Sequence, residues 1–118
     1  MPSPLPREVV VAPGQVLKVT EVESVGDVYG CCDFRRQEIQ ISSRLHPVEK
    51  HLILLHELIH IAGEKLKLSG VVKRQPPEEY TTELAGVLFL MLAYSGLWNG
   101  VTPEEAKEYV ESLGKEGE

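Results

Sequence analysis

Apolar and polar residues alternate in short runs along the first part of the chain, a pattern typical of β-strands. Residues 8–23 hold β-branched runs interrupted by Pro13-Gly14, which predicts two short strands joined by a turn. Residues 28–34 predict a third strand, and residues 38–42, where polar and apolar residues alternate, predict a half-buried fourth. The N-terminal part is therefore expected to form a small sheet.

From Pro47 the spacing changes to that of a helix. Apolar residues recur at steps of three and four, at Val48, Leu52, Leu55, Ile59, Ala62 and Leu66. Further apolar residues widen this stripe almost all round, so we expect a helix that is buried on most sides and ends at residues 68–70. Pro76-Pro77 and the acids after them predict a second helix that runs to about Leu97.

A third helix is predicted by a capping pattern, with Thr102 as N-cap and Glu105 three residues later, and it is expected to close at Gly114. Residues 84–103 carry no charge, but small and turn-forming residues break their second half. We therefore expect a buried core helix there and no membrane span. The prediction is one α+β domain over residues 1–118, with residues 1–6 and 115–118 irregular or disordered.

Composition narrows the function classes. A formal net charge of −6 over 118 residues disfavours binding to nucleic acid or to an anionic membrane. The two cysteines, Cys31 and Cys32, are adjacent, so a bond between them would be strained and free thiols are expected. Free thiols and the lack of a recognisable signal peptide lead us to expect a cytoplasmic protein.

The segment His56-Glu57-Leu58-Ile59-His60 carries the candidate chemistry. On a helix, His56 and His60 lie one turn apart on the same face, where two imidazoles can bind one Zn²⁺ ion. Glu57 is one step round and is placed to act as a general base toward water at the metal. Two histidines with this spacing in an otherwise apolar helix favour a metal site over ordinary buried imidazoles, because each must find a partner.

A third zinc ligand must come from elsewhere in the chain. We predict it from the second helix, where Glu79 and Glu83 lie four residues apart on one face, while Glu78 is expected to face solvent. His46 and His51 are expected to be solvated or to cap the helix. Tyr80 and Tyr94 are expected to pack in the core, with stabilisation of an oxyanion as a lesser possibility.

The motif at residues 56–60, with a helical glutamate about twenty residues later, resembles the gluzincin metallopeptidases. The short chain, with strands before the motif, also looks like minimal gluzincins and the short HExxH proteins of phages and mobile elements near the ImmA/IrrE type. The resemblance implies a zincin-like fold, in which a small mixed or mostly antiparallel sheet packs on the metal helix. It favours Glu79 as ligand and Glu83 as the acid that braces a ligand histidine, with swapped roles as the alternative. Thr82 departs from the small residue usual at its position.

The activity implied by this resemblance is zinc-dependent hydrolysis of a peptide or protein substrate, with Glu57 as general base. An edge strand near residues 29–33 is expected to hold an extended peptide by strand addition. The alternative is a catalytically weak or latent zinc-binding regulatory module on the same fold. Latency would follow if the N-terminus or the last helix blocked the cleft.

Overall fold

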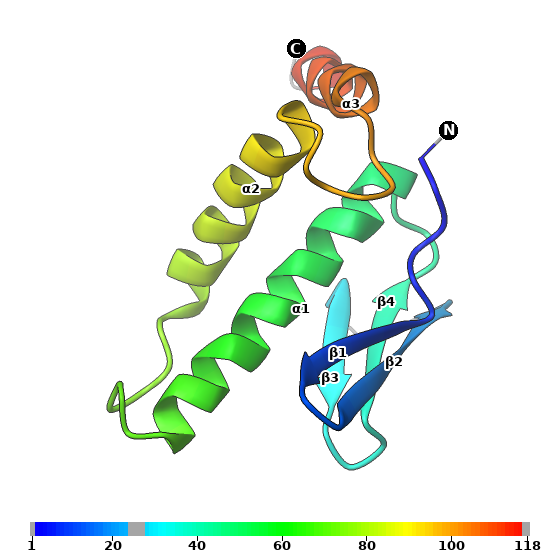
Figure 1. Cartoon of the computed structure of the whole chain (residues 1–118). Coiled ribbons are helices and arrows are strands. Elements are labelled where there is room, and N and C mark those ends of the chain that lie inside the picture. Colours follow the sequence, from blue (N-terminus) through cyan, green and yellow to red (C-terminus); the bar gives the residue numbers. More distant parts are fainter. Residues whose placement is uncertain (1, 24–27, 117–118) are drawn as a thin grey trace.

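Four strands followed by three helices make up the chain, as a computed structural model that describes residues 2–23 and 28–116 shows (Figure 1). The strands are β1 (Glu8–Ala12), β2 (Gln15–Val22), β3 (Gly30–Asp33) and β4 (Glu38–Ser42). The helices are α1 (Pro47–Leu68), α2 (Glu78–Tyr94) and α3 (Pro103–Glu116). The predicted α+β class is confirmed.

The sheet is mixed, with strand order β1-β2-β4-β3. The turn at Pro13-Gly14 joins β1 and β2 as an antiparallel hairpin, and the positive φ of 76° at Gly14 suits glycine. β2 and β4 run parallel, with Val19 opposite Ile39, whereas β3 pairs antiparallel with β4. Among the described strands, β3 pairs with β4 alone and so forms one edge of the sheet.

Helix α1 lies between the sheet and α2 (Figure 1). Its sheet-facing side buries Leu54 and Ile61 in a cluster with Leu17, Ile39 and Ile41. Its other side joins a second cluster shared with α2 and α3, made of Val48, Leu55, Phe89, Ala93, Val101, Ala106 and Tyr109. The nearly all-round apolar pattern of this helix therefore reflects packing on two opposite sides.

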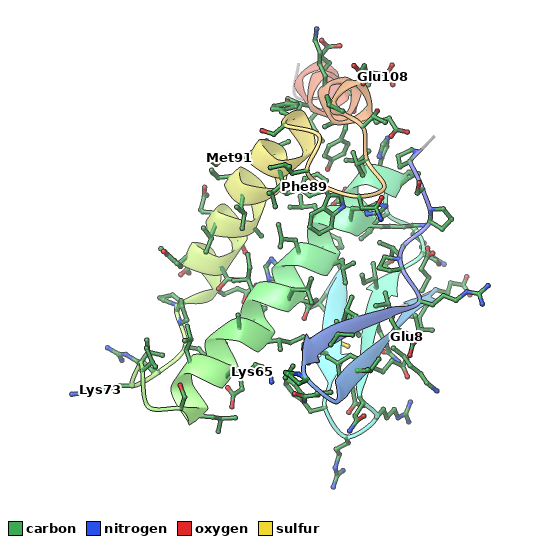
Figure 2. The ribbon with its side chains drawn as sticks, in the orientation of Figure 1. Glu8, Lys65, Lys73, Phe89, Met91 and Glu108 are labelled. Carbon is green, nitrogen blue, oxygen red and sulfur yellow. The ribbon has the colours of Figure 1, made fainter. Side chains whose placement is uncertain are left out.

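Helix α2 is buried along one side only. Its buried residues, Thr81, Ala85, Phe89 and Ala93, are spaced by four and face α1. Figure 2 shows Phe89 pointing toward α1 and Met91 pointing away from it. The expectation of a core helix thus holds for half of the surface of α2, and Tyr80 and Tyr94, expected in the core, are exposed.

The N-terminal segment is irregular, as expected, but it is tied to the body of the protein. The Ser3 amide donates to the Gly100 carbonyl at 2.7 Å, and His51 Nε2 lies 2.8 Å from the Ser3 carbonyl. His51 is 1% exposed and its Nδ1 accepts a hydrogen bond from the Trp98 indole at 3.0 Å. His51 is therefore a buried link between three segments, and the expectation that it is solvated is wrong.

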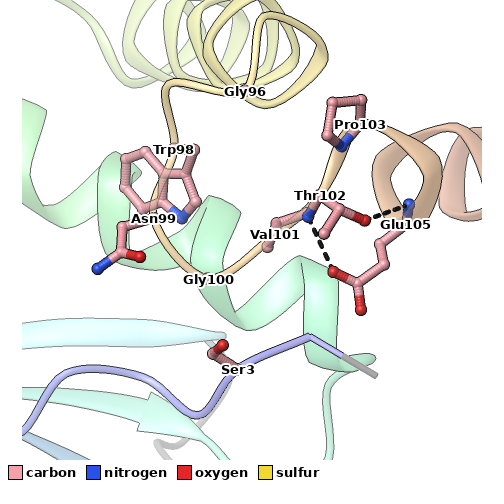
Figure 3. A pocket seen from close by; sticks show the side chains of 9 residues that line it. All are labelled: Ser3, Gly96, Trp98, Asn99, Gly100, Val101, Thr102, Pro103 and Glu105. Atoms are coloured by element: carbon pink, nitrogen blue, oxygen red, sulfur yellow. Dashed lines mark hydrogen bonds between the residues drawn. The ribbon is translucent and has the colours of Figure 1, made fainter.

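The loop before α3 carries the predicted capping box. Glu105 Oε1 accepts from the Thr102 amide at 2.8 Å, and the Thr102 hydroxyl accepts from the Glu105 amide at 3.1 Å (Figure 3). This loop and Ser3 line a shallow hollow of about 580 Å³. His46 caps α1, since its Nδ1 accepts from the Val48 amide at 3.1 Å.

Two helix ends differ from the prediction. α2 ends at Tyr94, three residues before the predicted end, where Gly96 adopts a φ of 71°. α3 continues past Gly114 to Glu116, so the predicted closure at Gly114 is wrong. Residues 117 and 118, also expected to be disordered, lie outside the described part. No helix in the described ranges is long and apolar enough to cross a membrane.

Gly30 marks the closest approach of β3 to α1. A Cβ atom there would lie 2.7 Å from Ile53 Cγ2 and 3.2 Å from the Gln40 carbonyl oxygen. Gly30→Ala is expected to lower the free energy of unfolding by about 1–3 kcal/mol, because the strand and helix must separate. Urea denaturation measures this loss.

Gly86→Ala is the matched control. Gly86 lies inside α2 with nothing within 4 Å of its added Cβ. This change is expected to stabilise the protein by about 0.5–1 kcal/mol, the usual gain for alanine over glycine in a helix. Equal effects of the two substitutions would contradict the close approach at Gly30.

Candidate metal centre

His56 and His60 project from α1 toward the start of α2. Their Nε2 atoms lie 3.1 Å apart, as one helical turn between the two residues permits. The side chain of His56 is 14% exposed and that of His60 is 29% exposed. Both ring nitrogens therefore converge on one point at the edge of the buried interior.

The carboxylate that meets them belongs to Glu78, the first residue of α2. Its Oε1 lies 2.8 Å from His56 Nε2 and its Oε2 lies 2.8 Å from His60 Nε2. These three residues are the one group of potential metal ligands found among the described residues, with all ligand atoms within 4.8 Å of one another. Glu78 faces solvent as expected, with a side chain that is 64% exposed, but it also contacts both histidines, which the sequence did not predict.

The spacing of these atoms fits the donor set that zinc requires. Tetrahedral coordination with bonds of about 2.0–2.1 Å places neighbouring ligand atoms about 3.4 Å apart. The two Nε2 atoms are 3.1 Å apart and each lies 2.8 Å from a different oxygen of the Glu78 carboxylate, so these separations are shorter by a few tenths of an ångström. Small side-chain rotations, which the 64% exposed side chain of Glu78 permits, would open the triad enough to admit an ion.

Glu79 and Glu83, the predicted ligands, lie outside this group. Both are exposed, because the buried face of α2 runs through Thr81, and at about 100° per residue a position two residues away points about 160° from it. Glu78, three residues before Thr81, falls close to the buried face. An acid from the predicted end of the predicted helix does lie beside the histidines, but that acid is Glu78 and not Glu79 or Glu83.

The start of α2 is held by a contact with the end of α1. The Gln75 amide donates to Glu64 Oε2 at 2.6 Å, and Glu64 lies one helical turn after His60. Gln75 also lies over Gly63, where a Cβ atom would be in ordinary van der Waals contact with its side chain at 3.4 Å. This contact positions the loop that leads through Pro76 and Pro77 into Glu78.

Glu57 is 7% exposed, yet no hydrogen bond to its carboxylate is found among the described residues. Burial raises the pKa of this carboxyl, while His60 and His56 oppose the rise and Glu78 adds to it. Its Oε1 lies beside Gly30, 3.5 Å from where a Cβ of that residue would be. Glu57 is thus a buried carboxyl of raised basicity between the edge strand and the histidines.

The triad and Glu57 open onto a cleft of about 810 Å³ between β3, α1 and the start of α2. Its apolar walls come from Val28, Tyr29, Phe34, Leu52 and Ile53, and Thr82 and Gln75 complete it near Glu78. No residue of the N-terminal segment or of α3 is among the lining residues. The alternative in which one of these segments blocks the cleft and causes latency therefore finds no support in the described part of the chain.

Cys31 and Cys32 also line this cleft, and both are free thiols, as expected. Burial, followed by the nearby charge of Glu57, raises the pKa of Cys32 to about 11 and raises that of Cys31 as well. Neither sulfur belongs to the histidine–glutamate group. The thiols are therefore protonated at neutral pH and contribute apolar bulk to the cleft wall.

This protonation predicts slow alkylation of both cysteines. At pH 7.5 a thiol of pKa about 11 is almost entirely protonated, so Cys32 should react with iodoacetamide about 100-fold more slowly than an exposed thiol of pKa about 8.5. Mass spectrometry of chelator-treated protein over a pH series measures the rates. The rate should rise steeply up to about pH 11, and a plateau below pH 9 would contradict the raised pKa.

Comparison of this chain with protein-family models, with curated protein sequences and with solved structures finds no match.

Proposed function

We propose that this chain is a zinc-dependent metallopeptidase with His56, His60 and Glu78 as metal ligands and Glu57 as general base. The observation that carries the proposal is the convergence of these three ligand atoms beside a buried carboxyl, at the wall of an open cleft. Structural zinc sites use four protein ligands, whereas catalytic sites use three and leave a position open. Three ligands facing a cleft support the catalytic type.

A zinc ion in such a site supplies Lewis acidity, toward the scissile carbonyl and toward water. Glu57 supplies the proton transfers. Its raised pKa makes its carboxylate a better proton acceptor than an exposed one, so it can take a proton from the attacking water and pass it to the leaving amine. The lack of a competing hydrogen bond leaves both of its oxygens available for that exchange.

The cleft supports an extended peptide as substrate. β3 is an edge strand, so its outward backbone groups can pair with a peptide laid along it. The exposed side chains of Val28, Tyr29 and Phe34 favour a substrate with apolar side chains. A volume of about 810 Å³ accommodates a few residues of peptide.

The ligand assignment predicts a clear order of metal affinities. His56→Ala, His60→Ala and Glu78→Gln should each weaken zinc binding more than about 100-fold. A loss of this size exceeds the roughly 10–100-fold loss that follows when a residue that only supports a ligand is removed. Glu79→Gln and Glu83→Gln are matched controls one residue and five residues along the same helix, and they should bind zinc like the wild type. Competition with a chromophoric zinc chelator measures the affinities. Loss of binding in either control, with Glu78→Gln unaffected, would assign the ligand elsewhere.

The catalytic role of Glu57 separates an enzyme from a zinc-binding regulatory module. Glu57→Gln should lower peptide hydrolysis by at least about 1,000-fold while zinc affinity changes little, since the residue moves protons and is not among the ligands. The assay measures how fast the zinc-loaded protein cleaves a library of fluorogenic peptides that contain apolar residues. The alternative, a weak or latent module, is favoured if wild type and Glu57→Gln bind zinc equally and neither cleaves any peptide.

A further inference from the structure

The face of α2 that points away from α1 carries a row of exposed apolar side chains. We call Tyr80, Leu84, Val87, Met91 and Tyr94 the outer stripe. Their spacing is four, three, four and three residues, and each is between 38% and 61% exposed. At about 100° per residue this row lies opposite the buried face of the helix.

The packing within one chain does not account for the outer stripe. Leu88 and Leu90 border the outer stripe and are only half-buried. Together with the stripe and the buried face they make α2 apolar around most of its circumference. A helix of this kind is normally covered on all sides. Here α1 covers one side, and α3 contacts the C-terminal end.

We propose that the outer stripe is the contact between two copies of this chain, packed with their α2 helices side by side and antiparallel. Alternating steps of three and four residues form a straight apolar seam, the pattern with which two helices pack at a small crossing angle. The seam contains no charged residue, so its best partner is an equally uncharged seam. A second copy presents the same surface.

The size of the stripe suits a pair of copies. Large apolar side chains present about 150–250 Å² each, so five of them at these exposures offer on the order of 500 Å² from each copy. Two stripes together bury about 1,000 Å², the lower limit of a specific interface, before the bordering Leu88, Leu90 and Leu97 are counted. Leu97, 73% exposed, lies just beyond the C-terminal end of the stripe.

Charge selects the antiparallel arrangement. The acids of α2, Glu78, Glu79 and Glu83, lie at its N-terminal end, and residues 78–94 contain no basic residue. Parallel helices would place six acids together, whereas antiparallel helices separate the two groups and oppose the helix dipoles. The same lack of cations makes an anionic lipid surface a poor partner for this face.

The contact leaves the cleft open. Glu78 and Thr82 line the cleft from the opposite side of α2, and no member of the outer stripe is among its lining residues. Each copy would therefore keep its own cleft. The partner copy's helix would pack on the face of α2 opposite Glu78 and so limit rotation of the helix that carries Glu78.

Sedimentation equilibrium of the full chain tests the pairing. Wild type is expected to show twice the chain mass of 13.1 kDa at concentrations above about 10 µM. Val87→Glu and Met91→Glu should weaken association at least 100-fold. Leu68→Glu is the matched control, because Leu68 is 77% exposed at the end of α1, away from the stripe, and should leave association unchanged. Circular dichroism checks that each variant keeps its helices.

Disulfide cross-linking tests the same contact without adding charge. In a Cys31→Ser, Cys32→Ser background, Val87→Cys lies at the centre of the stripe and should cross-link to its own copy, whereas Tyr80→Cys should not. Efficient cross-linking of Tyr80→Cys would show parallel helices and overturn the proposed arrangement. The proposal would be overturned if the wild type is monomeric at 100 µM, or if Leu68→Glu loses association as much as the stripe variants do. It would also be overturned if the chain is a monomer that binds anionic vesicles through the outer stripe.

Discussion

Burial of α1 between the sheet and α2 is the constraint on which the rest of the structure depends. The helix carries polar side chains into this interior, and a buried imidazole or carboxyl without a partner is costly. His51 meets the requirement with the Trp98 indole and the Ser3 carbonyl, and so holds the N-terminal segment in place. His56 and His60 meet it with Glu78. Every side-chain nitrogen or oxygen that is itself shut off from solvent in the described residues has a partner.

Glu57 meets the requirement in a different way, because its carboxylate has no partner among the described residues and instead lines the cleft, while partial burial raises its pKa. A carboxyl held in this way destabilises the folded state at neutral pH, where the unfolded chain would ionise freely. Such a cost is typical of a group that is placed for chemistry. The structure keeps Glu57 at the cleft wall because Ile53, one helical turn earlier, packs against Gly30 and fixes α1 against the edge strand.

Local signals predicted most of the fold. The turn at Pro13-Gly14, the helical period from Val48 onward and the capping box at Thr102 each depend on neighbours in sequence, and each appears where the pattern indicated. The parallel pairing of β2 with β4 is different, since nothing in either strand specifies which distant strand it will meet. The burial of His51 was missed for the same reason, because its partners, Ser3 and Trp98, are 48 and 47 residues away.

The third ligand of the candidate site, a carboxylate, shows where sequence reasoning stops. After Glu83, α2 is apolar nearly all round, so the hydrophobic pattern does not determine which way the helix is turned about its axis. An error of one residue rotates the expected face by about 100°, which is the difference between Glu79 and Glu78. The all-round pattern reflects two surfaces, one packed on α1 and one left exposed as the outer stripe. The ambiguity of the ligand and the unpaired apolar face thus have one cause, a helix built to be covered on both sides, and covering the second side would fix the rotation that places Glu78.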